Sequence, residues 1–213
     1  ENRLRRSVNS TCSVDYRYGA DGQRAVKYSG QGETLYFDAL WQLTTDYPDL
    51  RRSKHIYLGT ERVATRLNFE CHPDSGYEEL NTYIYHPDHL GSVQLVTDPR
   101  GEVYERVEYT PYGEIWIEQR QDSLNKIPFR FTGKELDPET GLHYFGARYL
   151  DARTSRWLSP DPAMERYLPL ASKADETWRQ NQNLVGEGGV FNPGNLSLYR
   201  YAMNSPTAYL DRD

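Results

Sequence analysis

Three side chains suited to acid–base chemistry stand in the last third of the sequence. Arg148 and Asp161 both lie in the stretch GARYLDARTSRWLSPDP, and Asp211 belongs to the final triplet DRD. Two carboxylates held close together cannot both ionise cheaply, so one keeps a proton and acts as an acid while the other accepts a proton from water. Hydrolysis of an amide bond requires this division of labour.

The neighbouring residues allow two interpretations of these side chains. Pro160 and Pro162 flank Asp161 and fix backbone angles, so its carboxylate is expected on a rigid turn, and the permanent charge of Arg148 can keep an aspartate ionised or hold a carbonyl oxygen. In the simpler interpretation, Asp161 caps a turn and Arg148 makes a structural ion pair. The residue types alone favour the simpler one, because Asp-Pro turns are common.

Other polar groupings give weaker signals. His86 and His89 in HPDH resemble a metal-binding pair, but Pro87 breaks helical spacing and no third ligand is near, so we predict no metal and no cofactor. Asp137 and Glu139 in DPETG could be glycosidase carboxylates, although the segment has the composition of a type I turn.

The aromatic residues also have two interpretations. The tryptophans, together with the tyrosines, could form a sugar-stacking surface, but packing in the core and between strands is favoured. The four tryptophans are Trp41, Trp116, Trp157 and Trp178.

The elements that must position these residues are predicted to be strands. The 213 residues fit one domain, with or without an appendage, and 18 tyrosines against 6 phenylalanines suit half-buried sheet surfaces. Tyr-rich segments alternate with Gly or Asp-Gly turns, which is typical of antiparallel hairpins. We therefore predict consecutive hairpins over residues 1–150. The turns are expected at residues 20–22, 98–101, 109–113 and 137–141.

The pattern changes after Pro162. Ser172 precedes acidic residues and Trp178, which predicts a short capped helix. A Gly-rich loop follows, then one more strand in LSLYRYAM and an Asn-Ser-Pro turn, and we expect this tail to pack as a plug on the sheet. The ends of such a sheet expose unpaired backbone groups, so other repeats of a larger protein, or other chains, should cover them.

Charge and composition exclude several classes of protein. The formal net charge is −6 and the basic residues are dispersed, which argues against a nucleic-acid surface. The sequence contains no run of 18 apolar residues, so we predict no membrane-spanning helix. The sequence begins with Glu1, so we expect it to be a piece of something longer. Cys12 and Cys71 match neither a zinc site nor a redox pair, and free thiols are favoured over a disulfide.

Several ordered motifs resemble the Rhs or YD-repeat family, and in particular its Rhs repeat-associated core region. They are YHPDHLGSVQLVTDPRGEV, YTPYGE, FTGKELDPETGLHYFGARYLD and SRWLSPDP, and the match spans about residues 83–213. The resemblance implies repeats wound into a hollow β shell that encloses a C-terminal toxin or other passenger, with the core region closing one end and cutting the chain just beyond itself. Relatives include bacterial polymorphic toxins, subunits of insecticidal toxin complexes and teneurins.

The resemblance also implies roles for the residues named at the outset. An arginine in the GARY block and an aspartate in the SPDP block support an aspartyl-protease-like self-cleavage in toxin-complex relatives, with a second aspartate in a final DPxG block. On this sequence they fall at Arg148, Asp161 and Asp211. The last block departs from the pattern, because it reads DRD and lacks the proline, the glycine and the bond to be cut.

We therefore expect a mainly β chain in two parts. Residues 1–130 would form a YD-repeat-like shell segment, and residues 131–213 an Rhs repeat-associated core that acts as an autoprotease at most once. The parent protein would be bacterial and secreted or on the cell surface, with possible use of secretion machinery. Two alternatives stay open: a noncatalytic carbohydrate-binding or adhesion module, and a self-assembling structural β unit.

Overall fold

The computed structural model describes residues 3–46, 49–69, 75–121, 127–162 and 197–209. Its larger sheet, the long sheet, has eleven strands, and each is hydrogen-bonded to the next one in chain order. The strands are β1 (Arg6–Val8), β2 (Ser13–Tyr18), β3 (Arg24–Ser29), β4 (Gly32–Tyr36), β5 (Trp41–Asp46), β6 (Asp49–Leu58), β7 (Glu61–Phe69), β8 (Thr82–Pro87), β9 (Val93–Thr97), β10 (Val103–Tyr109) and β11 (Ile115–Arg120). All pairs are antiparallel, as expected for consecutive hairpins.

The tight turns between the last four strands share one design. In each, a glycine amide donates to the carbonyl three residues earlier at 3.0 Å, and the glycine has a positive φ that other residues rarely adopt. The donor–acceptor pairs are Gly91 with Asp88, Gly101 with Asp98, and Gly113 with Thr110. The predicted turns at 98–101 and 109–113 are confirmed, and those at 20–22 and 137–141 likewise join paired strands.

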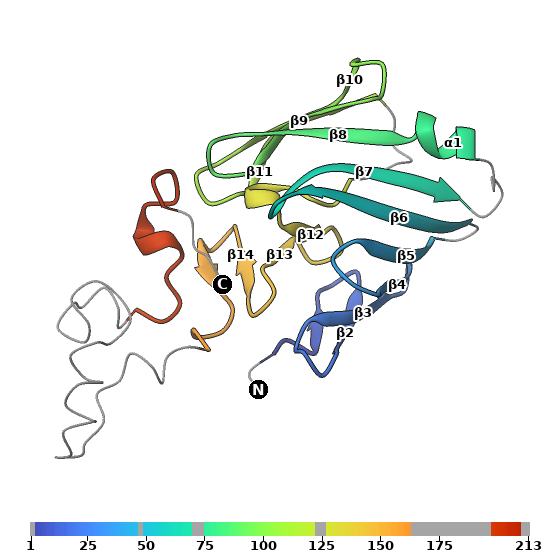
Figure 1. Ribbon diagram of the computed structural model, residues 1–213. Coiled ribbons are helices and arrows are strands. Elements are labelled where there is room, and N and C mark those ends of the chain that lie inside the picture. Colours follow the sequence, from blue (N-terminus) through green and yellow to red (C-terminus); the bar gives the residue numbers. More distant parts are fainter. Residues whose placement is uncertain (1–2, 47–48, 70–74, 122–126, 163–196, 210–213) are drawn as a thin grey trace, which may run out of the picture.

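A second sheet, the small sheet, follows the long sheet in the chain. It contains β12 (Glu135–Asp137), β13 (Leu142–Tyr144), β14 (Tyr149–Asp151) and β15 (Arg156–Trp157), preceded by the short turn η1 (Phe131–Gly133). Figure 1 shows the long sheet curving from its blue end to its green end, with the yellow and orange segment of the small sheet against its inner side. Three-residue strands bury little by themselves, so the small sheet depends on this contact.

Three apolar clusters pack on the inner face of the long sheet. The first joins strands β7 to β10 to Ile127 and Phe129. The second surrounds Trp157, and the third joins Val14 and Tyr16 of β2 to the small sheet. Each cluster contains residues far apart in the sequence, so the small sheet and the segment before it pack along much of the inner face of the long sheet.

Two local expectations need correction. The segment predicted to form a strand near the end pairs only at Arg200, opposite Arg156, and then turns through η4 (Ala202–Asn204). All three residues of η4 have positive φ, and a chain in that conformation cannot continue an extended strand. A helix that the sequence did not predict, α1 (Ser75–Leu80), joins β7 to β8. The helix expected around Ser172 lies outside the described residues.

Candidate active site

Arg148 lies at the end of the hairpin between β13 and β14. The amide of Phe145 donates to the Arg148 carbonyl at 3.0 Å, and Gly146 takes a φ of 95° that permits this tight reversal. The Arg148 side chain is 5% exposed. The hairpin therefore places a permanent cation inside the molecule, where it needs a compensating partner.

Asp161 provides that partner. Its Oδ2 lies 3.1 Å from Nη1 of Arg148, and its side chain remains 25% exposed. The backbone before it is anchored because the Leu158 amide donates to the Tyr149 carbonyl at 2.9 Å. Two of the three predicted residues thus meet in the folded chain. Asp211 lies outside the described residues.

Aromatic rings surround the buried side of this ion pair. The guanidinium carbon of Arg148 lies 4.1 Å from the centre of the Trp157 ring. Phe145 packs edge-on against Trp157 at 4.9 Å, and Tyr201 does so at 5.3 Å. The Trp157 amide donates to the carbonyl of Tyr199 at 3.0 Å. The site is therefore assembled from the β13–β14 hairpin, β15 and the segment 197–209.

Backbone strain is concentrated beside these rings. Ala202, Met203 and Asn204 have φ values of 43°, 55° and 58°, and they directly follow Tyr201. Non-glycine residues in this region cost about 1–3 kcal/mol each, and such strain clusters at functional sites. The surrounding packing holds the turn in place, since Tyr201 is completely buried and Ala202 nearly so.

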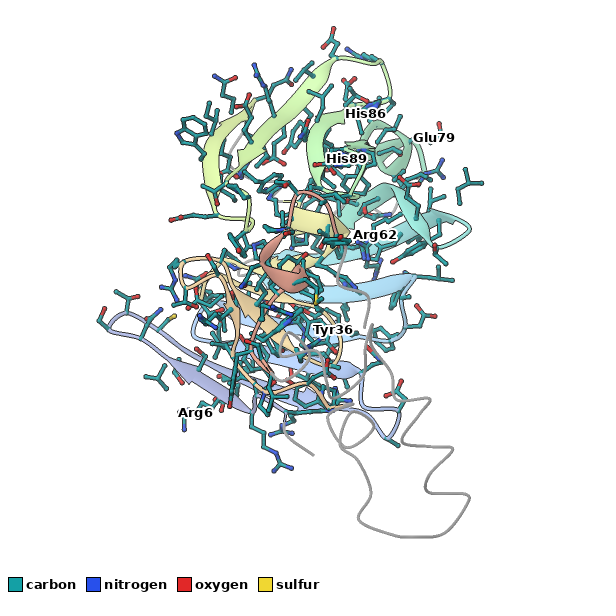
Figure 2. The ribbon with its side chains drawn as sticks, turned by 90° about the vertical axis from the view of Figure 1, so that its left-hand side faces the viewer. Arg6, Tyr36, Arg62, Glu79, His86 and His89 are labelled. Atoms are coloured by element: carbon teal, nitrogen blue, oxygen red, sulfur yellow. The ribbon has the colours of Figure 1, made fainter. Side chains whose placement is uncertain are left out.

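A second group of charges, the charge cluster, joins the small sheet to β3. Its members are Arg24, Lys27, Glu135, Asp137 and Glu139. Arg24 lies 2.8 Å from Asp137 and 2.9 Å from Glu135. The Tyr36 hydroxyl donates to Glu135 at 2.8 Å, and Figure 2 shows Tyr36 near the middle of the molecule, unlike Arg6 at its rim.

The opposite charges of the charge cluster shift the pKa values of Glu135 and Lys27. Burial alone raises the pKa of Glu135, but the charges of Arg24 and Lys27 outweigh it and leave that pKa below its ordinary value. For Lys27, burial alone lowers the pKa, but the charges of Asp137, Glu135 and Glu139 outweigh it and leave the pKa above its ordinary value. Asp137 and Glu139, which the sequence offered as possible glycosidase carboxylates, form ion pairs with Arg24 and Lys27 inside the fold.

A third ionic group lies at the other end of the inner face. Glu105 is fully buried. Its carboxylate accepts hydrogen bonds from both terminal nitrogens of Arg130, at 2.7 and 2.9 Å, and from Nε of Arg120 at 2.8 Å. The paired geometry satisfies both carboxylate oxygens, which a buried charge requires. It fastens the segment before η1 to β10 and β11.

Two buried histidines complete the inner face. Nδ1 of His55 lies 2.9 Å from the Thr65 hydroxyl, and Nε2 of His143 lies 3.1 Å from the Gly113 carbonyl. Burial lowers the pKa of His55 to about 3 and the pKa of His143 to about 4. Both are neutral at pH 7. The sequence did not identify them, because alternation along a strand does not distinguish an inward histidine from an outward one.

The remaining candidates do not converge. His86 approaches Thr97 and His89 approaches the Thr207 carbonyl, and no cluster of three His, Cys, Asp or Glu able to hold a metal exists among the described residues. Cys12 is a free thiol near the Glu139 carbonyl, while Cys71 lies outside the described part of the chain.

The tryptophans do not share one surface in the part of the chain that the structure covers. Trp157 is buried, Trp116 is 75% exposed on β11, and Trp41 packs on Phe37 six strands away from β11. Trp178 lies outside the described residues. The described tryptophans therefore offer no common stacking platform for a sugar.

Comparison with known proteins identifies the family. A family model described as Teneurin YD-shell matches residues 3–207. The chain belongs to the teneurin YD-shell family. This YD-shell chain is 40% identical over 167 residues to toxin subunit YenC1 of Yersinia entomophaga, covering 71% of the chain and 17% of that subunit. It is 26% identical over 203 residues to Teneurin-3 of Danio rerio, covering 94% of the chain and 6% of that protein.

A solved structure shares the fold of this YD-shell chain. The crystal structure of TcdB2-TccC3 superposes with a TM-score of 0.71 and 25% identity, over 97% of this chain and 9% of that one. The chain thus spans less than a fifth of each of these relatives. The predicted resemblance to Rhs and YD-repeat shells and the mainly β fold are confirmed, and the relatives support a toxin-related β shell.

The same relatives bear on the setting of the protein. The toxin-complex and teneurin relatives point to an extracellular or surface protein. Among the described residues, no helix is long and apolar enough to cross a membrane.

Proposed function

We propose that this chain belongs to the end of a hollow β shell that encloses a C-terminal toxin or other passenger. Residues 131–213 would form the module that cuts the passenger free, once, by an aspartyl-protease-like reaction. The observation that carries the proposal is the contact between Arg148 and Asp161, at 3.1 Å, with a quarter of the Asp161 side chain open to solvent.

The chemistry divides between two carboxylates. Arg148 holds the Asp161 carboxylate in place, and Asp161 accepts a proton from a water molecule whose oxygen attacks the amide carbon. Asp211 supplies a proton to the amide nitrogen, and the carbon–nitrogen bond breaks to give a carboxylic acid and an amine. The role of Asp211 rests on the family resemblance, and the bond to be cut would lie after Asp213.

The partners of the shell follow from its edges. β1 and β11 are the two outer strands of the long sheet. Unpaired strand edges attract other strands, so further repeats of the parent polypeptide, or other chains of a toxin complex, would cover them. We place the parent protein outside the bacterial cell, where a passenger can be delivered by secretion machinery.

The test uses the polypeptide encoded by the whole gene, including everything after Asp213. In the unmutated protein we expect two fragments in a denaturing gel and by mass spectrometry, with one new terminus just beyond the core. Asp161→Asn removes the proton acceptor and should leave one full-length chain. Its retained circular dichroism spectrum would show that the shell still folds.

Asp151→Asn is the matched control. Asp151 also pairs with an arginine, Arg153 in the turn between β14 and β15, at 2.9 Å, but it takes no part in the proposed reaction. This variant should be cut like the unmutated protein. A single uncut chain from the unmutated gene, or normal cutting of Asp161→Asn, would refute the proposal.

A further inference from the structure

Trp157 presents the face of its ring to the guanidinium of Arg148. The guanidinium carbon lies 4.1 Å from the ring centre, within the range of a cation–π contact. Trp157 is 2% exposed and the Arg148 side chain 5%, so bulk water does not screen the contact. Such contacts are strongest with tryptophan and when desolvated.

Two further aromatic rings pack against Trp157. Phe145 meets it edge-on at 89° and Tyr201 at 66°, and the Trp157 amide is fixed to the Tyr199 carbonyl. Phe145 belongs to the hairpin that carries Arg148, whereas Tyr201 comes from the segment before the strained η4 turn. The Trp157 ring is therefore fixed in position by its neighbours, and the Arg148 side chain packs against it.

A stacked ring holds a guanidinium without using its hydrogen bonds. The donors of guanidinium lie at its edge, in the plane of the group, and a ring face accepts none of them in that plane. A ring face below the guanidinium carbon therefore limits the movement of the group without competing for the nitrogen that faces a carboxylate. Here Nη1 faces Oδ2 of Asp161 at 3.1 Å.

We propose that Trp157 is a positioning residue for the self-cleavage, which acts by holding the Arg148 guanidinium in the plane that serves Asp161. The inference rests on the proposed function and goes beyond it, because it assigns a part in the reaction to an aromatic side chain that touches no reacting atom. The proposal requires an aromatic ring at position 157 because its face contacts the Arg148 guanidinium, in addition to its packing in the core.

The experiment follows cleavage in time. The full gene is translated in a cell-free system, synthesis is stopped, and the full-length and cut chains are measured on denaturing gels. Trp157→Leu should slow cleavage roughly tenfold or more, because the stacking contact is lost. Trp157→Phe keeps a ring face and should stay within about threefold of the unmutated rate. If Trp157→Leu does not fold, Trp157→Met replaces it, since methionine fills irregular gaps.

Phe131→Leu is the control for core damage. Phe131 lies in the same apolar cluster as Trp157 and also contacts Tyr201, with the ring centres 6.0 Å apart, but it is not stacked on Arg148. It should be cut at the unmutated rate even where its loss of stability equals that of Trp157→Leu. Equal slowing of the two variants, or normal cutting of Trp157→Leu, overturns the inference.

Asp161→Asn, run alongside, separates the two claims. If Asp161→Asn is cut normally, the proposed function fails. If Asp161→Asn stays whole while Trp157→Leu is cut at the unmutated rate, only the positioning role of Trp157 fails.

Discussion

Arg24 and Arg148 are both buried arginines that face aromatic rings and carboxylates, yet their surroundings differ. Arg24 lies between Asp137 and Glu135, whose carboxylates are 0% and 9% exposed. Arg148 has Asp161, which is 25% exposed. Water can therefore reach the carboxylate of Asp161, but it hardly reaches those of Asp137 and Glu135. The exposure of Asp161 is what the proposed hydrolysis requires, whereas the charge cluster holds the fold together.

Gly113 is the residue at which a turn meets the core. It has a φ of 90°, and a Cβ added there would lie 2.5 Å from Cγ of Phe131. Gly113→Ala should lower the free energy of unfolding by about 3 kcal/mol, from backbone strain together with overpacking. Urea denaturation followed by tryptophan fluorescence measures this loss.

Gly101→Ala is the matched control for that substitution. Gly101 ends a turn of the same design with a φ of 82°, and nothing lies within 4 Å of an added Cβ. The change should cost only about 1 kcal/mol, from the backbone alone. If both variants lose the same stability, Phe131 does not support the turn.

At the scale of elements, the small sheet is held by its neighbours more than by itself. Its strands are two or three residues long, and side chains from β3 and β4 reach across to β12. The Arg24–Asp137 contact joins residues 113 positions apart in the chain. Removing one partner of such a buried pair leaves a charge uncompensated, and this costs more than the pair itself contributes.

Asp137→Asn tests this attachment. We expect it to lower the free energy of unfolding by about 3 kcal/mol or more, because Arg24 and Lys27 both lose a buried countercharge. Asp15→Asn provides the comparison. Asp15 pairs with Arg6 at 3.5 Å on the exposed edge of the long sheet, and its loss should change stability by about 0.5 kcal/mol or less. Similar losses in urea denaturation would mean that the charge cluster contributes little.

Over the whole molecule, the small sheet and its flanking turns brace the curve of the long sheet. At one end the charge cluster ties β12 to β3, and at the other Arg130 binds Glu105 of β10. Arg62 donates to the Gly133 carbonyl between them, and Figure 2 labels Arg62 in the middle part of the molecule. The curvature of the long sheet is therefore fixed by contacts along its inner face.

The two buried histidines make the stability of the molecule depend on pH. His55 and His143 have pKa values of about 3 and about 4 in the folded chain, against 6.5 ordinarily. Between the folded and ordinary values the unfolded chain binds more protons, so stability rises with pH there. It is fully present above the ordinary value of 6.5 and is lost as the pH falls toward the folded values.

We therefore expect urea denaturation to give a lower free energy of unfolding at pH 5.5 than at pH 7.5, by about 1.4 kcal/mol for each histidine. His143→Gln should remove about half of that difference, whatever its effect at pH 7.5. An equal pH dependence in the variant and the unmutated protein would show that His143 is not held neutral by burial.

The sequence by itself determined the turns, the hairpins and the family. Turn chemistry is local, since Pro99 and Gly101 set the backbone of their own turn within four residues, and the ordered motifs place Arg148 and Asp161 in named blocks. It was wrong about the strand near Arg200 and missed α1, because neighbours in the fold outweigh short-range preference over so few residues.

Only the tertiary structure decided which charges are buried and which rings meet. The sequence around Asp137 indicates only an ordinary turn, whereas the fold pairs this residue with Arg24. Nothing near Trp157 in the sequence indicates that Tyr201 will pack against it. The physical reason is that burial and electrostatic pairing depend on which surfaces come together, and those surfaces belong to segments that are distant along the chain.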